Sequence, residues 1–170
     1  MSKKTRNLTL SALFAAFTVI SLYFASIWPT GLFGLVAFSS LFATAAVIDA
    51  GLASGISVFL VSSILGMLII PDKAAPLLYI FFFGYYPVVK SLIERIRYII
   101  IQWALKLLVF NLSLTVIWFL FGSLVFDFGD NTPNLIFIYM GGSAVFALFD
   151  YGYTKIIWLY INRISRYIKR

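Results

Sequence analysis

Long apolar segments separated by short polar stretches dominate the sequence and constrain its fold. A bilayer core requires roughly 20 apolar residues per helix. Hydrophobic residues make up 62% of the 170 residues and charged residues only 11%, so a water-soluble domain of this size could not cover its apolar surface. The sequence therefore predicts an all-α integral membrane protein in which residues 1–170 form one domain. We expect a six-transmembrane-helix bundle with spans near 8–28, 32–48, 51–70, 75–89, 107–126 and 135–158.

Most of the basic residues gather in three clusters, which flank the apolar segments. The clusters are Lys3, Lys4 and Arg6; Lys90, Arg95 and Arg97; and Lys155, Arg163, Arg166, Lys169 and Arg170. With a cytoplasmic amino terminus, all three lie on the cytoplasmic side and only Lys73 is left outside, in agreement with the positive-inside bias. We therefore expect both termini to be cytoplasmic. A cleaved signal peptide is a less favoured interpretation of the first span, because the apolar run exceeds the usual length of about 7–15 residues.

The apolar segment that follows the second basic cluster is too long for one span. A helix over residues 98–126 would be about 43 Å long. A polar stripe at three- and four-residue steps marks its first part: Arg95, Tyr98, Gln102 and Lys106. We therefore interpret 90–106 as an amphipathic interfacial segment and 107–126 as the true span. Such a segment could rest among anionic lipid headgroups or dock a partner protein.

The residue types needed for most catalytic chemistry are missing. Cysteine and histidine are absent, which removes thiol chemistry and the usual zinc ligands. Asp150 has no second carboxylate at its depth, as an intramembrane aspartyl enzyme would require. The net charge of +7 belongs to the clusters beside the spans and does not indicate nucleic acid. We expect no enzymatic activity, no cofactor, no metal site and no nucleic-acid partner.

Two charged residues fall inside predicted spans or at their cytoplasmic edge. Asp150 lies about one turn inside Lys155, and Lys106 lies at a similar depth on the neighbouring segment. Charges at these depths are expensive unless they are paired. We expect an intramembrane ion pair between Lys106 and Asp150, which could serve the structure or act as a proton or ion relay.

Small residues form one edge of the first span near its basic end. Ala12 and Ala16 are four residues apart and share a helix face, with Ala15 beside them. Membrane helices approach one another closely through such residues. The edge could therefore pack against a neighbouring helix of the same chain, or it could receive a helix of another protein.

The first span contains the stretch "ALFAA" near its start, and the chain combines about 170 residues with six expected spans and two cytoplasmic termini. In these features the chain resembles the substrate-capture (S) component of an energy-coupling factor (ECF-type) ABC vitamin transporter. In that family an alanine-x-x-x-alanine motif on the first helix contacts the T component, a pattern that Ala12 and Ala16 match. The resemblance implies a multi-pass protein of the bacterial cell membrane, surrounded by lipid, that captures a vitamin or similar solute. Its partners would be a T-type transmembrane coupling subunit and two ATPase subunits, and this sequence has no P-loop of its own.

Polar and aromatic residues at the outer ends of the spans are candidates for binding this solute. Asn111, Thr115 and Trp118 can share a face of the fifth span. The remaining candidates are Trp28, Tyr79, Asp127, Asp130, Asn131, Asn134 and Tyr139. The aromatic residues could instead form an interfacial belt. In the resembled family, external loops and outer helix ends hold the solute; the loops correspond to 28–34, 70–77 and 127–135. Their acidic residues favour a neutral or cationic solute.

A second hypothesis is a structural or assembly protein without a solute site, such as an MreD-like scaffold of the envelope machinery. Its length and hydrophobicity would be similar. An outward-facing cavity would favour the capture component, whereas a filled interior would favour the scaffold. A stand-alone secondary transporter usually contains inverted repeats, and the sequence shows none.

Overall fold

The computed structural model describes residues 3–125 and 134–163, and within these ranges the chain is helical with no strand. The long helices are α1 (Lys3–Ile27), α2 (Leu32–Ala50), α3 (Leu52–Ile69), α6 (Ile99–Val125) and α7 (Leu135–Arg163). Between α3 and α6 the chain forms α4 (Ala74–Leu78), a π-helical turn (Tyr79–Phe83) and α5 (Tyr86–Ile93). The described residues contain six helical segments that are long and apolar enough to cross a membrane. The prediction of an all-α chain with six such segments is therefore confirmed.

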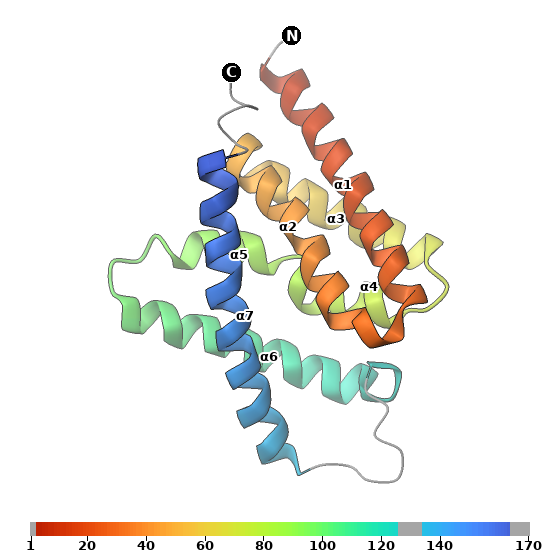
Figure 1. The fold of residues 1–170 in the computed structure, drawn as a ribbon, viewed down its shortest axis with the longest axis vertical. Coiled ribbons are helices and arrows are strands. Elements are labelled where there is room, and N and C mark those ends of the chain that lie inside the picture. The colour runs from red at the N-terminus through yellow and green to blue at the C-terminus, as the bar shows by residue number, and fades with distance from the viewer. Residues whose placement is uncertain (1–2, 126–133, 164–170) are drawn as a thin grey trace.

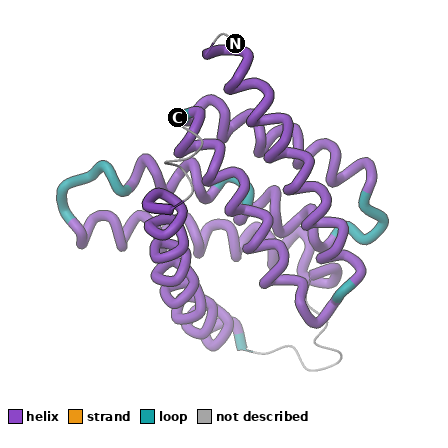
Figure 2. The backbone as a smooth tube through the Cα atoms, turned by 45° about the horizontal axis from the view of Figure 1, so that its top comes forward, coloured by secondary structure: helices purple, strands orange, loops and turns teal. Residues whose placement is uncertain are grey.

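The first three long helices pack together (Figure 1), and α6 and α7 cross beside them, as a second view also shows (Figure 2). A short turn, Pro29–Gly31, joins α1 to α2. Gly51 alone separates α2 from α3, and its φ of 96° lies in the left-handed region that favours glycine. Helix α1 begins and α7 ends at the same end of the molecule (Figure 1).

Small side chains allow α1, α2 and α3 to approach closely. Ala15, Ala43 and Ala46 are buried with Val58 in one apolar cluster. Gly55 of α3 lies against α2, where a Cβ atom would collide with the side chain of Val47 and lie 3.5 Å from the carbonyl oxygen of Ala43. The close packing of α2 and α3 therefore depends on the missing side chain at this position.

Gly55→Ala is expected to destabilise the protein by about 1–3 kcal/mol, the usual cost of overpacking. Val47 is β-branched and stiff at χ1, so its side chain cannot rotate away freely. The free energy of unfolding in mixed micelles measures the effect. Gly34→Ala is the matched control, because a Cβ atom at Gly34 meets nothing within 4 Å. Equal stability of the two variants would contradict the close approach of α2 and α3.

The fourth span is irregular and lies at the centre of the protein. Its π-helical turn ends at Gly84, whose N–H donates to the carbonyl oxygen of Tyr79 at 2.6 Å. Pro87 occupies the first turn of α5, where the missing N–H costs no helical hydrogen bond. Tyr79, Phe82 and Tyr86 of this span are buried in the main apolar core.

Residues 90–106, interpreted from the sequence as an amphipathic interfacial segment, do not form one continuous helix. Residues 90–93 end α5, residues 94–98 turn, and α6 runs unbroken from Ile99 through residue 106 and onward. Two residues of the polar stripe have partners inside the protein: Lys106 is 4% exposed, and the Gln102 side-chain amide donates to the carbonyl oxygen of Ile96 at 2.7 Å. The other two, Arg95 and Tyr98, are exposed. Partners within the protein therefore satisfy the polar groups of Gln102 and Lys106, and the interfacial position of the segment stays a prediction.

Candidate functional site

A cleft of about 550 Å³ lies between α2, the irregular fourth span, α6 and α7. Its volume falls within the range of small-molecule sites. Seven phenylalanines contribute to its walls: Phe33, Phe82, Phe83, Phe110, Phe137, Phe146 and Phe149. The cleft is the candidate solute site in the described part of the chain.

Aromatic packing holds the deep wall of the cleft in place. Phe110 and Phe146 stack with ring centroids 4.7 Å apart and planes 12° apart. Phe82 meets Phe110 edge-on at 5.4 Å and Phe146 edge-on at 5.8 Å. Such stacked and edge-to-face pairs stabilise one another beyond their burial. The wall is therefore organised before any ligand arrives.

The cleft offers almost no hydrogen bonding to a ligand. Ser113 is the one lining residue with a polar side chain among those the structure places there. Its hydroxyl donates to the carbonyl oxygen of Val109 at 2.7 Å and also contacts the Tyr85 hydroxyl. Because both contacts lie within the protein, the walls present an apolar surface to any occupant.

The sequence-predicted residues of the fifth and sixth spans meet one another and do not line this cleft. Thr115 and Tyr139 share a hydrogen bond of 2.7 Å between their hydroxyl groups. The Asn111 amide donates to the carbonyl oxygen of Leu107 at 2.9 Å and contacts the hydroxyl of Ser143 at 3.4 Å. These groups join α6 to α7, and they are not among the cleft's lining residues.

The other predicted solute-binding residues are dispersed. Tyr79 is fully buried, and the Ser62 hydroxyl donates to its hydroxyl at 3.0 Å. Trp28 is 67% exposed just after α1, and Trp118 is half-buried on α6. Asn134 precedes α7 and accepts the N–H of Ile136 through its side chain at 3.4 Å. Asp127, Asp130 and Asn131 lie outside the described residues.

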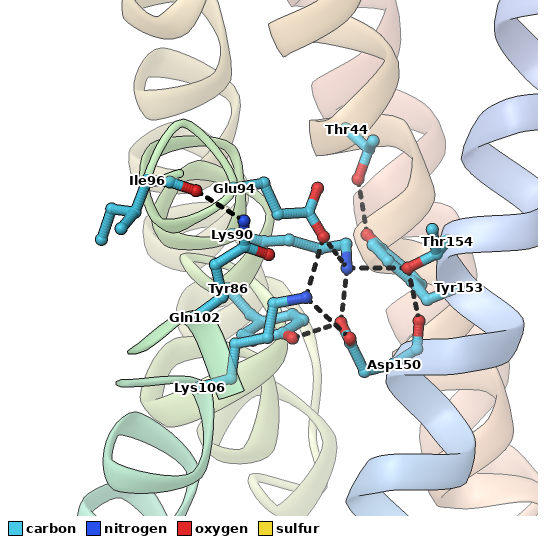
Figure 3. A network of polar contacts seen from close by, with 10 residues as sticks. All are labelled: Thr44, Tyr86, Lys90, Glu94, Ile96, Gln102, Lys106, Asp150, Tyr153 and Thr154. Carbon is cyan, nitrogen blue, oxygen red and sulfur yellow. Dashed lines mark hydrogen bonds and ion pairs between the residues drawn. The ribbon is translucent and has the colours of Figure 1, made fainter. Parts of the chain in front are cut away.

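A network of four charged side chains, three of them buried, joins α5, α6 and α7 (Figure 3). Lys106 Nζ lies 2.8 Å from Asp150 Oδ2, which is the pair expected from the sequence. Lys90 Nζ lies 2.5 Å from Asp150 Oδ1. Both ammonium groups also meet Glu94 Oε1, Lys90 at 2.6 Å and Lys106 at 2.8 Å. The Tyr86 hydroxyl donates to Asp150 Oδ1 at 2.5 Å.

The four charges of this network balance one another. Lys90, Lys106 and Asp150 are 1%, 4% and 2% exposed, and the side chain of Glu94 is 37% exposed. Two ammonium groups therefore face two carboxylates, as burial in a membrane requires. The network is closed by its own members and leaves no buried charge without an opposite partner.

Lys90, Glu94 and Tyr86 were missed by the sequence analysis, which placed Lys90 in a cytoplasmic basic cluster. A signal was present, because residues 86, 90 and 94 are spaced four apart and can share a face. Next to the network, the hydroxyl of Tyr153 contacts that of Thr44 at 2.5 Å (Figure 3) and joins α7 to α2.

The small-residue edge of α1 is divided between the interior and the surface. Ala15 is 3% exposed and packs within the cluster of α1, α2 and α3. Ala12 and Ala16 are exposed. The chain's own helices therefore cover Ala15 and leave the other two alanines accessible.

Comparison with known proteins adds no relative: no family model, no curated protein and no solved structure matches the chain.

Proposed function

We propose that this protein is the membrane-embedded solute-binding subunit of a modular importer of the ECF type. The observation that carries the proposal is the cleft between α2, the fourth span, α6 and α7, which is large enough for a small molecule. A chain that only held other proteins would have no need of such a space. The protein would hold the solute there and deliver it to a partner that supplies the energy.

The exposed alanines of α1 support the second half of this proposal. Ala12 and Ala16 lie one turn apart on a face that the described helices leave open. Small residues let the backbone of another helix approach closely. A T-type coupling subunit is the proposed occupant, with two ATPase subunits attached to it.

The arrangement of the helix ends supports the proposed orientation in a bacterial cell membrane. Helix α1 begins and α7 ends at the same end of the molecule (Figure 1). Exposed Arg95 and Arg97 lie in the turn between α5 and α6. With that turn in the cytoplasm, the basic clusters would follow the positive-inside bias. Both termini would then be cytoplasmic.

Native mass spectrometry of the purified protein tests the proposed capture role. We expect a co-purified small molecule that Gly34→Leu removes, because Gly34 lines the cleft and a side chain there has open space to fill. Gly141→Leu is the matched control: a Cβ atom at Gly141 also meets nothing within 4 Å, and this residue is not among those lining the cleft. A bound molecule that survives Gly34→Leu would argue against this site.

A scaffold role is the second candidate, and one observation favours it. Asn111, Thr115 and Tyr139 are engaged in joining α6 to α7, as expected of a protein whose polar groups serve its own assembly. A scaffold would purify with other envelope proteins and without a small molecule in the cleft.

A further inference from the structure

The mouth of the cleft is formed by exposed apolar residues of two helices, two of which lie in the first turns of α2 and α7. Phe33 of α2 is 47% exposed, and Phe137 and Val145 of α7 are 73% and 66% exposed. Residues 137–145 cover about 12 Å of α7 at 1.5 Å per residue, within a segment apolar enough to cross a membrane. The floor is buried, with Phe82 and Phe146 4% and 2% exposed. The cleft therefore runs from an apolar mouth near the starts of α2 and α7 to a packed aromatic floor.

Resting on the proposed function, we infer that the solute is an uncharged, planar and largely apolar molecule that enters the cleft between the starts of α2 and α7. A charged or strongly polar solute would lose its hydration in the cleft and gain no hydrogen bond in return, because the hydroxyl of Ser113 is already engaged. Burying an unpaired polar group costs several kcal/mol in general. A hydrocarbon-like solute has no polar group to desolvate and therefore does not pay this cost.

The aromatic floor favours binding of a planar solute over binding of a lipid acyl chain. Phe110 and Phe146 present stacked rings, and Phe82 meets both edge-on. Aromatic faces gain specific stacking and edge-to-face contacts with flat, unsaturated groups. A flexible saturated chain would lose conformational freedom on entry and make no stacking contacts. The cleft is therefore selective for a rigid unsaturated body.

Photolabelling of the full chain in phosphatidylcholine nanodiscs tests this inference. The probe is an apolar aryl diazirine, the competitor is diphenylhexatriene, and peptide mass spectrometry locates the label. We expect labelling to concentrate on cleft residues of α2, α6 and α7, and excess competitor to reduce it about tenfold. Gly34→Leu and Ala37→Leu both fill the cleft and are expected to abolish this site-specific labelling, whereas Gly141→Leu preserves it. Using two filling variants guards against misfolding of either one.

Two outcomes would overturn the inference. Labelling spread evenly over lipid-facing residues such as Ile64 and Leu68 of α3, or insensitive to the competitor, would show a cleft occupied by ordinary acyl chains. A hydrophilic metabolite recovered by native mass spectrometry and lost in Gly34→Leu would reject the apolar class while leaving the proposed capture role standing. Conversely, specific labelling in a protein that never assembles with a coupling subunit would uphold the ligand class and reject the importer.

Discussion

Asp150→Asn is expected to destabilise the protein by about 3–5 kcal/mol, the usual cost of breaking a buried ion pair by removing one partner. The substitution leaves Lys90 and Lys106, both nearly fully buried, with Glu94 as the remaining carboxylate of the network. Asparagine keeps the size of the side chain, so the loss reports the charge and not a cavity. The free energy of unfolding in mixed micelles measures the effect, with Arg95→Gln on the exposed turn as a control.

A double-mutant cycle separates direct pairing from general destabilisation. Lys106→Met is also expected to destabilise the protein, because it leaves a carboxylate with one fewer cation. The double variant Asp150→Asn/Lys106→Met should lose less than the sum of the two single losses, since residues in contact are coupled by about 0.5–3 kcal/mol. Strict additivity would reject the pairing of Lys106 with Asp150. Lys90 also contacts Asp150, so the coupling should be large but not complete.

If the proposed coupling and ATPase subunits bind at α1, Ala12→Leu/Ala16→Leu is expected to prevent their recovery with the tagged protein. Two leucines would hold a partner helix away from the α1 backbone, which small residues otherwise allow it to approach. Both alanines are exposed within the described chain, so the fold and the affinity for solute should be unchanged. Co-purification from a host that expresses all subunits, quantified by mass spectrometry, measures the loss.

Two comparisons make the result of the alanine experiment interpretable. Ala53→Leu introduces the same side chain at an exposed alanine of α3 and should leave the complex intact. Ala15→Leu alters a residue that is 3% exposed, and it should lower the stability of the isolated chain through overpacking. Normal assembly of the Ala12/Ala16 variant would remove the reason for assigning α1 a coupling role.

The helical segments and one ion pair could be predicted from the sequence because each depends on local or strongly constrained features. Apolar length alone identifies a membrane-crossing helix, and Asp150 needed a cation at its own depth, which Lys106 supplied. The involvement of Lys90 and Glu94 depends on where the fourth span ends. The π-helical turn and the turn at residues 94–98 decide that point, and both are consequences of tertiary packing.

The cleft was less accessible to sequence reasoning than the helical segments were. Polar residues such as Asn111 and Thr115 were expected to face a ligand, but an amide or hydroxyl in an apolar setting binds whichever partner lies nearest, here another helix. The cleft is built from phenylalanines and glycine, residue types that also fill ordinary membrane-protein cores. Whether these residues line a cleft or fill a core depends on how α6 and α7 cross. That crossing is set by contacts between residues distant in the sequence.

The charge network also has a consequence for how the protein is made. Lys90 and Lys106 leave the ribosome well before Asp150, which lies on the last helix of the described chain. Until that helix is synthesised, these two cations have only the carboxylate of Glu94 among the acidic partners of the network, a state that would be costly in lipid in the proposed membrane setting. Release of the earlier helices into the bilayer should therefore await α7, and a ribosome-stalled or truncated chain lacking it should be a preferred substrate for membrane quality control.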